Sequence, residues 1–155
     1  MPSNLVGILL PLQLKDAMGE GGATIYGYLN SLNGFVVILC TPVFTVLLGR
    51  YTEIPKIILG LLLFIGGIAL FSLEAATMIL FVGMFVFTLG EVVTVLGHNP
   101  YNSRRVPASH RGRIGGISSV VHSIFSSVTQ YLISFMLILT GSNYPLLWLI
   151  FVGFG

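Results

Sequence analysis

The segment LGEVVTVLGHNPYNSRRVPASHRGRIGG, residues 89–116, joins an apolar run to a short basic cluster, and the rest of the chain can be interpreted from it. Glu91 lies within the apolar part, and four arginines follow between positions 104 and 113. Arginine and lysine gather in the short cytoplasmic loops of membrane proteins. The segment therefore predicts a membrane helix that leads into a cytoplasmic loop.

The composition of the whole chain is that of a membrane protein. Of its 155 residues, 55% are hydrophobic and 8% are charged, whereas about a quarter of the residues in a soluble domain are charged. The mean hydropathy is +0.97. All but one of the lysines and arginines are confined to two short segments and are not spread over a water-facing surface, which argues against a nucleic-acid partner. We expect an integral protein of the plasma membrane, surrounded by lipid.

Uncharged apolar runs divide the chain into six helical segments that form one transmembrane domain, residues 1–155. A helix needs roughly 20 apolar residues to cross the bilayer. Trp148 suits an interfacial position within the last segment. The fold class is therefore all-α, a polytopic bundle of membrane helices, with four full spans at 24–48, 57–73, 75–97 and 114–140 and two partial spans at 4–14 and 145–155.

The basic residues give these spans an orientation. Six of the seven lysines and arginines fall in the loops after spans 24–48 and 75–97, which the alternation of spans places on one side. Lys15 alone falls on the other side. This bias predicts that the two basic loops are cytoplasmic.

Both basic loops resemble loops of the major facilitator superfamily of transporters. The sequence LGRYTEIPK at 48–56 resembles the family loop G-x-x-x-D-R/K-x-G-R/K-R/K, without its aspartate and its second glycine. The sequence NPYNSRRVPASHRGRIGG at 99–116, after a Gly-Glu pair, resembles the Pro-x-x-x-Arg-Gly loop, carried here by Pro107, Arg111 and Gly112. The weakened first loop is typical of the second half of these proteins. The resemblance therefore implies a C-terminal-half fragment, from the end of helix seven to the start of helix twelve.

This resemblance also implies a function. A full member has two six-helix bundles that rock about a midplane site, so a missing N-terminal half would be the partner of this chain. The implied protein is a permease, a secondary active transporter that moves a small organic solute by alternating access. By similarity to multidrug antiporters, the proton is the expected coupling ion. The alternative is a small, non-transporting membrane protein that assembles with a partner.

Polar residues inside the spans are candidates for the path of solute or protons. Asn30 and Asn33 share a helical face with Tyr26, Thr41 and Thr45, because these residues recur at helical spacing. In span 114–140, His122 and Gln130 lie among serines that we expect to support close helix packing. The side-chain amides of these residues could bind solute or form hydrogen bonds between helices. Because Asn30 and Asn33 share one helical face, we favour a position that lines the cavity. Span 57–73 lacks a polar stripe, so we expect it at the periphery, with Gly60, Gly66 and Gly67 close to another helix.

Glu91 needs a partner, because a charge at the centre of a membrane helix costs about 2.5–3.5 kcal/mol on insertion scales. One interpretation is a cytoplasmic latch, in which Glu91 pairs with Arg50, Arg111 or Arg113 in one transport state. The other is a proton carrier. Glu91 is close to the cytoplasmic end of its span, and ion-pair networks also perturb carboxylates, so we prefer the latch. His122 is either hydrogen-bonded within its own surroundings or a proton relay to Glu91.

No pattern in the chain favours enzymatic chemistry. A Ser-His-Asp grouping, metal-ligand spacing and a phosphate-binding glycine loop are all absent from the sequence. Cys40 is the single cysteine, so neither a disulfide within the chain nor a cysteine metal site can form. The sequence thus predicts no enzyme, no metal and no cofactor.

Overall fold

The computed structural model describes residues 2–73, 77–105, 107, 110–141 and 143–154, and the side chains of 6–73, 77–100, 107, 110, 112–141 and 143–150. Within these residues the chain is helical and contains no strand, so the expected all-α class is confirmed. The helices are α1 (Pro2–Met18), α2 (Glu20–Leu48), α3 (Glu53–Ser72), α4 (Thr77–Arg105), α5 (Arg111–Thr140) and α6 (Tyr144–Phe154).

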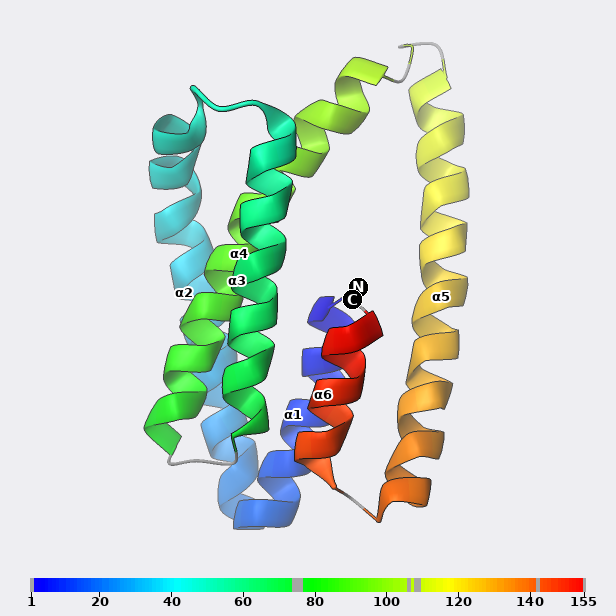
Figure 1. Ribbon diagram of the computed structural model, residues 1–155. Helices are drawn as coiled ribbons and strands as arrows, with labels where there is room; N and C mark the ends of the chain where they lie inside the picture. Colours follow the sequence, from blue (N-terminus) through cyan, green and yellow to red (C-terminus); the bar gives the residue numbers. More distant parts are fainter. Residues whose placement is uncertain (1, 74–76, 106, 108–109, 142, 155) are drawn as a thin grey trace.

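Consecutive helices run in opposite directions (Figure 1). Helices α2, α3 and α4 form one group, α5 stands apart from them, and the short helices α1 and α6 lie between. In the described part of the chain, four helical segments are long and apolar enough to cross a membrane, as expected: Glu20–Leu48, Glu53–Ser72, Thr77–Pro100 and Gly112–Thr140.

Both basic loops connect helices at the same end of the bundle. The C-terminal ends of α2 and α4 and the N-terminal ends of α3 and α5 all lie at the top of Figure 1. The opposite end carries the turn at Gly19, whose φ of 60° is in the region that favours glycine. The charge bias is therefore a bias between the two ends of the bundle, and the assignment of the basic end to the cytoplasm stays a prediction.

Helix α4 is longer than the sequence pattern predicted. It continues to Arg105, past the expected end at residue 97, and includes Pro100. Polar residues beyond the apolar run do not prevent a helix, so the apolar pattern alone gives too short a length. Glu91 consequently lies midway between Thr77 and Arg105. Within the candidate membrane span Thr77–Pro100, Glu91 lies closer to the end that leads to the basic residues, and its depth relative to the cytoplasmic surface stays a prediction.

Helices α3 and α4 pack through glycines spaced by seven residues. A Cβ at Gly90 would lie 2.8 Å from the carbonyl oxygen of Gly60, and a Cβ at Gly67 would lie 2.7 Å from the Phe87 Cβ. The expected close approach at Gly60 and Gly67 is therefore confirmed. At Gly66 a Cβ would make an ordinary contact, 3.8 Å from Val86. Seven residues make about two helical turns, so each set of glycines lies on one face.

The other face of α3 is apolar and exposed, with Ile54, Ile58, Leu62 and Ile65 at helical spacing. This face is of the kind that lipid covers. The peripheral position of α3 in a larger bundle stays a prediction.

A buried glutamine connects α1, α3 and α6 at the opposite end of the bundle. The Trp148 indole Nε1 donates a hydrogen bond to Gln13 Oε1 at 2.8 Å, and Gln13 Nε2 donates to the Phe71 carbonyl oxygen at 3.5 Å. Nearby, the Tyr144 hydroxyl donates to Asp16. Trp148 is fully buried, and its N–H group finds a partner inside the bundle. Its expected depth at the membrane interface stays a prediction.

Candidate functional site

The face of α4 that meets α2 carries two polar side chains, Thr88 and Glu91. Residues three apart on a helix lie on the same side. Thr88 is fully buried and Glu91 is half-buried. Across from them, α2 contributes Asn33, which is also half-buried. The two helices thus bring together a carboxylate, a hydroxyl and an amide.

A single amide group connects these residues. Asn33 Nδ2 donates hydrogen bonds to Thr88 Oγ1 at 2.9 Å and to Glu91 Oε2 at 3.4 Å. An amide nitrogen has two hydrogens, so both are used. The Thr88 hydroxyl in turn donates to the Met84 carbonyl oxygen at 2.7 Å. The hydroxyl is therefore oriented with its lone pairs toward α2.

Next to this network is a pocket of about 270 Å³ between α2 and α4. Thr41, at its far end, is about 12 Å along the α2 axis from Asn33, toward the basic end of the bundle. The Thr41 hydroxyl donates to the Val37 carbonyl oxygen at 2.6 Å. The pocket is lined by Asn33, Val37, Thr41, Glu91, Val92, Val95 and Leu96. It therefore has a carboxylate at one end and a hydroxyl at the other, with apolar walls between them.

The structure unites two of the residues that the sequence singled out, Asn33 and Glu91. Asn30, from the same predicted polar face, is exposed. Sequence reasoning missed Thr88 as a member of the site. Its spacing of three residues from Glu91 was the available signal, because it places both residues on one face of a helix.

His122 and Gln130 are exposed on α5, which stands apart from α2 and α4 (Figure 1). The expected close packing of the α5 serines is not observed in the described part of the chain. Instead, the Ser123 and Ser127 hydroxyls donate to carbonyl oxygens of their own helix, at 2.9 Å and 3.0 Å. Such bonds within one helix satisfy a hydroxyl without a neighbouring helix.

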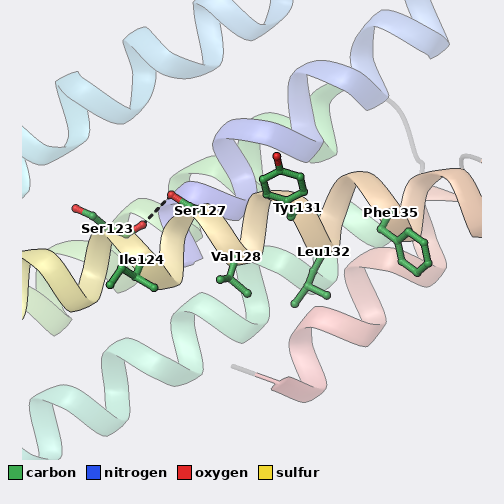
Figure 2. A pocket seen from close by; sticks show the side chains of 7 residues that line it. All are labelled: Ser123, Ile124, Ser127, Val128, Tyr131, Leu132 and Phe135. Carbon is green, nitrogen blue, oxygen red and sulfur yellow. Dashed lines mark hydrogen bonds between the residues drawn. The ribbon is translucent and has the colours of Figure 1, made fainter.

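A second, larger hollow of about 730 Å³ runs along α5. Figure 2 shows Ile124, Val128 and Leu132 pointing to one side of the helix and Tyr131 to the other. The lining residues are Ser123, Ile124, Ser127, Val128, Tyr131, Leu132 and Phe135. Most of this lining is apolar, so the hollow suits an apolar or amphipathic molecule.

The proposed latch involves three arginines at the basic end. Arg50 and Arg113 are exposed, and the side chain of Arg111 lies outside the described residues. Arg50 is about 25 Å along the chain direction of α2 from Asn33, the residue that contacts Glu91. A pair between Arg50 and Glu91 would therefore require a different arrangement of the helices. The latch stays a prediction for another transport state.

Within the residues that the structure describes, no group of three or more histidine, cysteine, aspartate or glutamate side chains is arranged to hold a metal ion. Cys40 is a half-buried free thiol on α2. The chemistry that the α2–α4 site offers is therefore that of one carboxylate with neutral oxygen and nitrogen groups around it.

A comparison with known proteins finds a similar transporter. A Na(+), Li(+), K(+)/H(+) antiporter from Planococcus maritimus is 32% identical over 103 residues, which are 66% of this chain and 24% of that protein. The match thus spans about a quarter of the relative's length. No protein-family model matches the chain, and no solved structure matches it.

Proposed function

We propose that this chain is part of a secondary active transporter of the major facilitator type that exchanges protons for a solute across the plasma membrane. The observation that carries the proposal is the position of Glu91, half-buried midway along a helix long enough to cross a membrane. Ionisable residues at such positions face a bundle interior or a water-filled cavity and mark ion and proton paths. The similarity to a cation/proton antiporter supports the same class.

Glu91 is suited to gain and lose a proton because its surroundings can serve both states. As a carboxylate it accepts a hydrogen bond from Asn33 Nδ2. As a carboxylic acid it has a proton to donate, and an amide that rotates by a half-turn offers its oxygen as the acceptor. Protonation also removes the cost of a charge in the membrane. The proton-carrier interpretation of Glu91 is therefore preferred here over the latch.

The transported solute is a small organic molecule in this proposal. The apolar hollow along α5 supports it, since a mostly apolar lining with two serines fits an amphipathic molecule. The name of the Planococcus relative favours a second candidate, a monovalent metal cation. Both candidates require a proton site, and Glu91 would provide it in either case.

Alternating access requires a second bundle for the first to rock against. Only 6% of the most apolar window of α2, and 6% of that of α5, is buried within the bundle. The N-terminal half of the transporter would cover the polar residues on α2 and α5. Lipid would cover the apolar surface of these helices that is left exposed. Asn30, His122 and Gln130, all exposed here, would then face the cavity between the two halves.

The test replaces the carboxylate by an uncharged group of nearly the same shape. Glu91→Gln is introduced into the full-length gene product, which is reconstituted in vesicles, and solute movement is measured with and without an imposed proton gradient. We expect the dependence on the gradient to be lost, because glutamine cannot release a proton. The matched control is Glu20→Gln, an exposed carboxylate at the start of α2, which should leave coupling unchanged. Retained coupling in Glu91→Gln would refute the proton-carrier role.

A further inference from the structure

We infer that Glu91, Asn33 and Thr88 form a binding site for a monovalent metal cation, which competes with the proton for the Glu91 carboxylate. The inference rests on the proposed function, with its second candidate, a monovalent metal cation, as the exchanged solute. It assigns the ion site of the transporter to the contact between α2 and α4. It concerns sodium-like ions, which prefer oxygen ligands.

The charge of the site matches a monovalent ion. Glu91 supplies one negative charge, and Asn33 and Thr88 are neutral. Divalent and transition metals bind to groups of carboxylates, histidines or cysteines, and the described residues hold no group of three such side chains. One carboxylate balances one cation of unit charge or one proton, but not both. Binding of the proton therefore displaces the cation.

Two oxygens beside the carboxylate are prepared to act as ligands. The proton of the Thr88 hydroxyl is held by the Met84 carbonyl at 2.7 Å, so the lone pairs of Thr88 Oγ1 remain available. They now accept the Asn33 amide at 2.9 Å. The terminal torsion of asparagine is roughly two-fold, so a half-turn replaces the amide nitrogen by Oδ1. After that turn an oxygen of Asn33 takes the place of the nitrogen beside Thr88 Oγ1 and Glu91 Oε2, so that three oxygens lie close together.

The amide of Asn33 thus has a different role in each state. Without the cation, its two hydrogens bond to Thr88 and Glu91 and partly compensate the carboxylate charge. With the cation, the ion replaces those hydrogens and the amide oxygen becomes a ligand. Three protein oxygens leave room for water to complete the coordination, and the adjoining pocket of about 270 Å³ can hold it.

The pocket also provides a route for the ion. From Asn33 it extends about two helical turns along α2 to Thr41, on the side of the basic end. The Thr41 proton is held by the Val37 carbonyl at 2.6 Å, so its oxygen can replace a water of the ion during entry. The pocket therefore extends from the ion site toward the end of the bundle that the charge bias assigns to the cytoplasm.

Among the described residues, the helices around the site carry other titratable groups. On α2, Cys40 is half-buried next to Thr41, and Tyr26 lies two turns before Asn33. On α3, the helix on the other side of α4, Glu53 and Lys56 pack near Gly97. On α4 itself, His98 is exposed two turns beyond Glu91. Of all these titratable groups, Glu91 is the one that accepts a hydrogen bond from Asn33. We therefore assign the competition between proton and cation to Glu91.

The experiment removes one oxygen ligand and leaves the carboxylate in place. The full-length gene product is reconstituted in vesicles that contain a pH-sensitive dye, and proton release is measured as Na⁺, Li⁺ or K⁺ is added outside. Thr88→Val should raise the cation concentration for half-maximal response by about tenfold, since a hydrogen-bonding group to a charge is removed. Thr88→Ser, which keeps the oxygen, should restore the response and shows that the fold tolerates changes at this position.

The matched control is Thr45→Val on α2. Thr45 is exposed, and its hydroxyl donates to the Thr41 carbonyl oxygen at 2.6 Å, the same kind of bond that Thr88 makes. It should respond to cations like the unmodified protein. Equal cation dependence in Thr88→Val and Thr45→Val would overturn the ion site. If Glu91→Gln nevertheless lost proton coupling, the proposed function would stand without the ion site. If Glu91→Gln kept proton coupling, both the proton-carrier role and the ion site would be refuted.

Discussion

Helix α4 contacts α3 on one side and α2 on the other, and the two contacts differ in chemistry. The α3 contact is built from glycines and leaves no space, since a Cβ at Gly90 would lie 2.8 Å from the backbone nitrogen of Phe64. The α2 contact is built from Asn33, Thr88 and Glu91 and borders a pocket. One side of the helix is therefore closely packed, and the other side borders the pocket at which we propose that ligands exchange.

The difference has a physical reason. Between helices in lipid there is no hydrophobic driving force, and close packing of small residues provides much of the attraction. A tight contact cannot open for an ion without losing that packing. The polar contact, in contrast, consists of hydrogen bonds worth about 0.6 kcal/mol on average in a membrane protein. Such a contact costs less free energy to break, which suits the exchange of ligands proposed for this side of α4.

The largest expected effect comes from adding one methyl group to the tight contact. Gly90→Ala should lower the free energy of unfolding by about 1–3 kcal/mol, because backbone atoms of Gly60 and Phe64 would have to move. The thermal unfolding midpoint of the detergent-solubilised protein measures the effect. Gly34→Ala on α2, where a Cβ meets nothing within 4 Å, is the control and should not lower the midpoint. Equal midpoints for the two variants would contradict the tight contact.

A smaller effect is expected from the polar contact. Asn33→Leu removes both hydrogen bonds to α4 and should cost about 1 kcal/mol, twice the average for such bonds. The matched control is Asn30→Leu, since Asn30 is exposed on the same helix. Unfolding midpoints of both variants are compared with that of the unmodified protein. If Asn30→Leu destabilised the protein as much as Asn33→Leu, the network would have no special part in holding α2 to α4.

Sequence alone predicted the number of long helices, because an apolar run of sufficient length has few alternatives in a membrane. It also singled out Glu91, since a carboxylate in such a run needs an explanation. The partner of Glu91 could not be predicted in this way. Asn33 and Glu91 are 58 positions apart, and their contact depends on how α2 and α4 are aligned along their axes.

The same limit applies at the other end of the bundle. Gln13 and Trp148 are 135 positions apart and are bonded across α1 and α6. A single sequence shows that each is polar enough to need a partner, but not which one it finds. The length of α4 was missed for a different reason, because polar residues end an apolar run without ending a helix.

The smallest effect, with the opposite sign, is expected at Thr94. Its hydroxyl oxygen is buried in the α3–α4 contact, against Gly60, and has no hydrogen-bond partner among the residues that the structure describes. Thr94→Val replaces that hydroxyl by a methyl group, so the unfolding midpoint should stay the same or rise, by up to about 1 kcal/mol in free energy.

Thr94→Val and Thr88→Val make the same chemical change on the two sides of α4, so their effects can be compared directly. Thr94 lies on the side that holds the helix in place, and its variant should keep the cation dependence of the unmodified protein. Thr88 lies on the side that contacts Asn33, and its variant should lose affinity for cations. A fall in the midpoint of Thr94→Val would mean that its hydroxyl stabilises the contact between α3 and α4. Hydroxyl groups would then stabilise both contacts of α4. The division of α4 into a closely packed side and a side that exchanges ligands would fail.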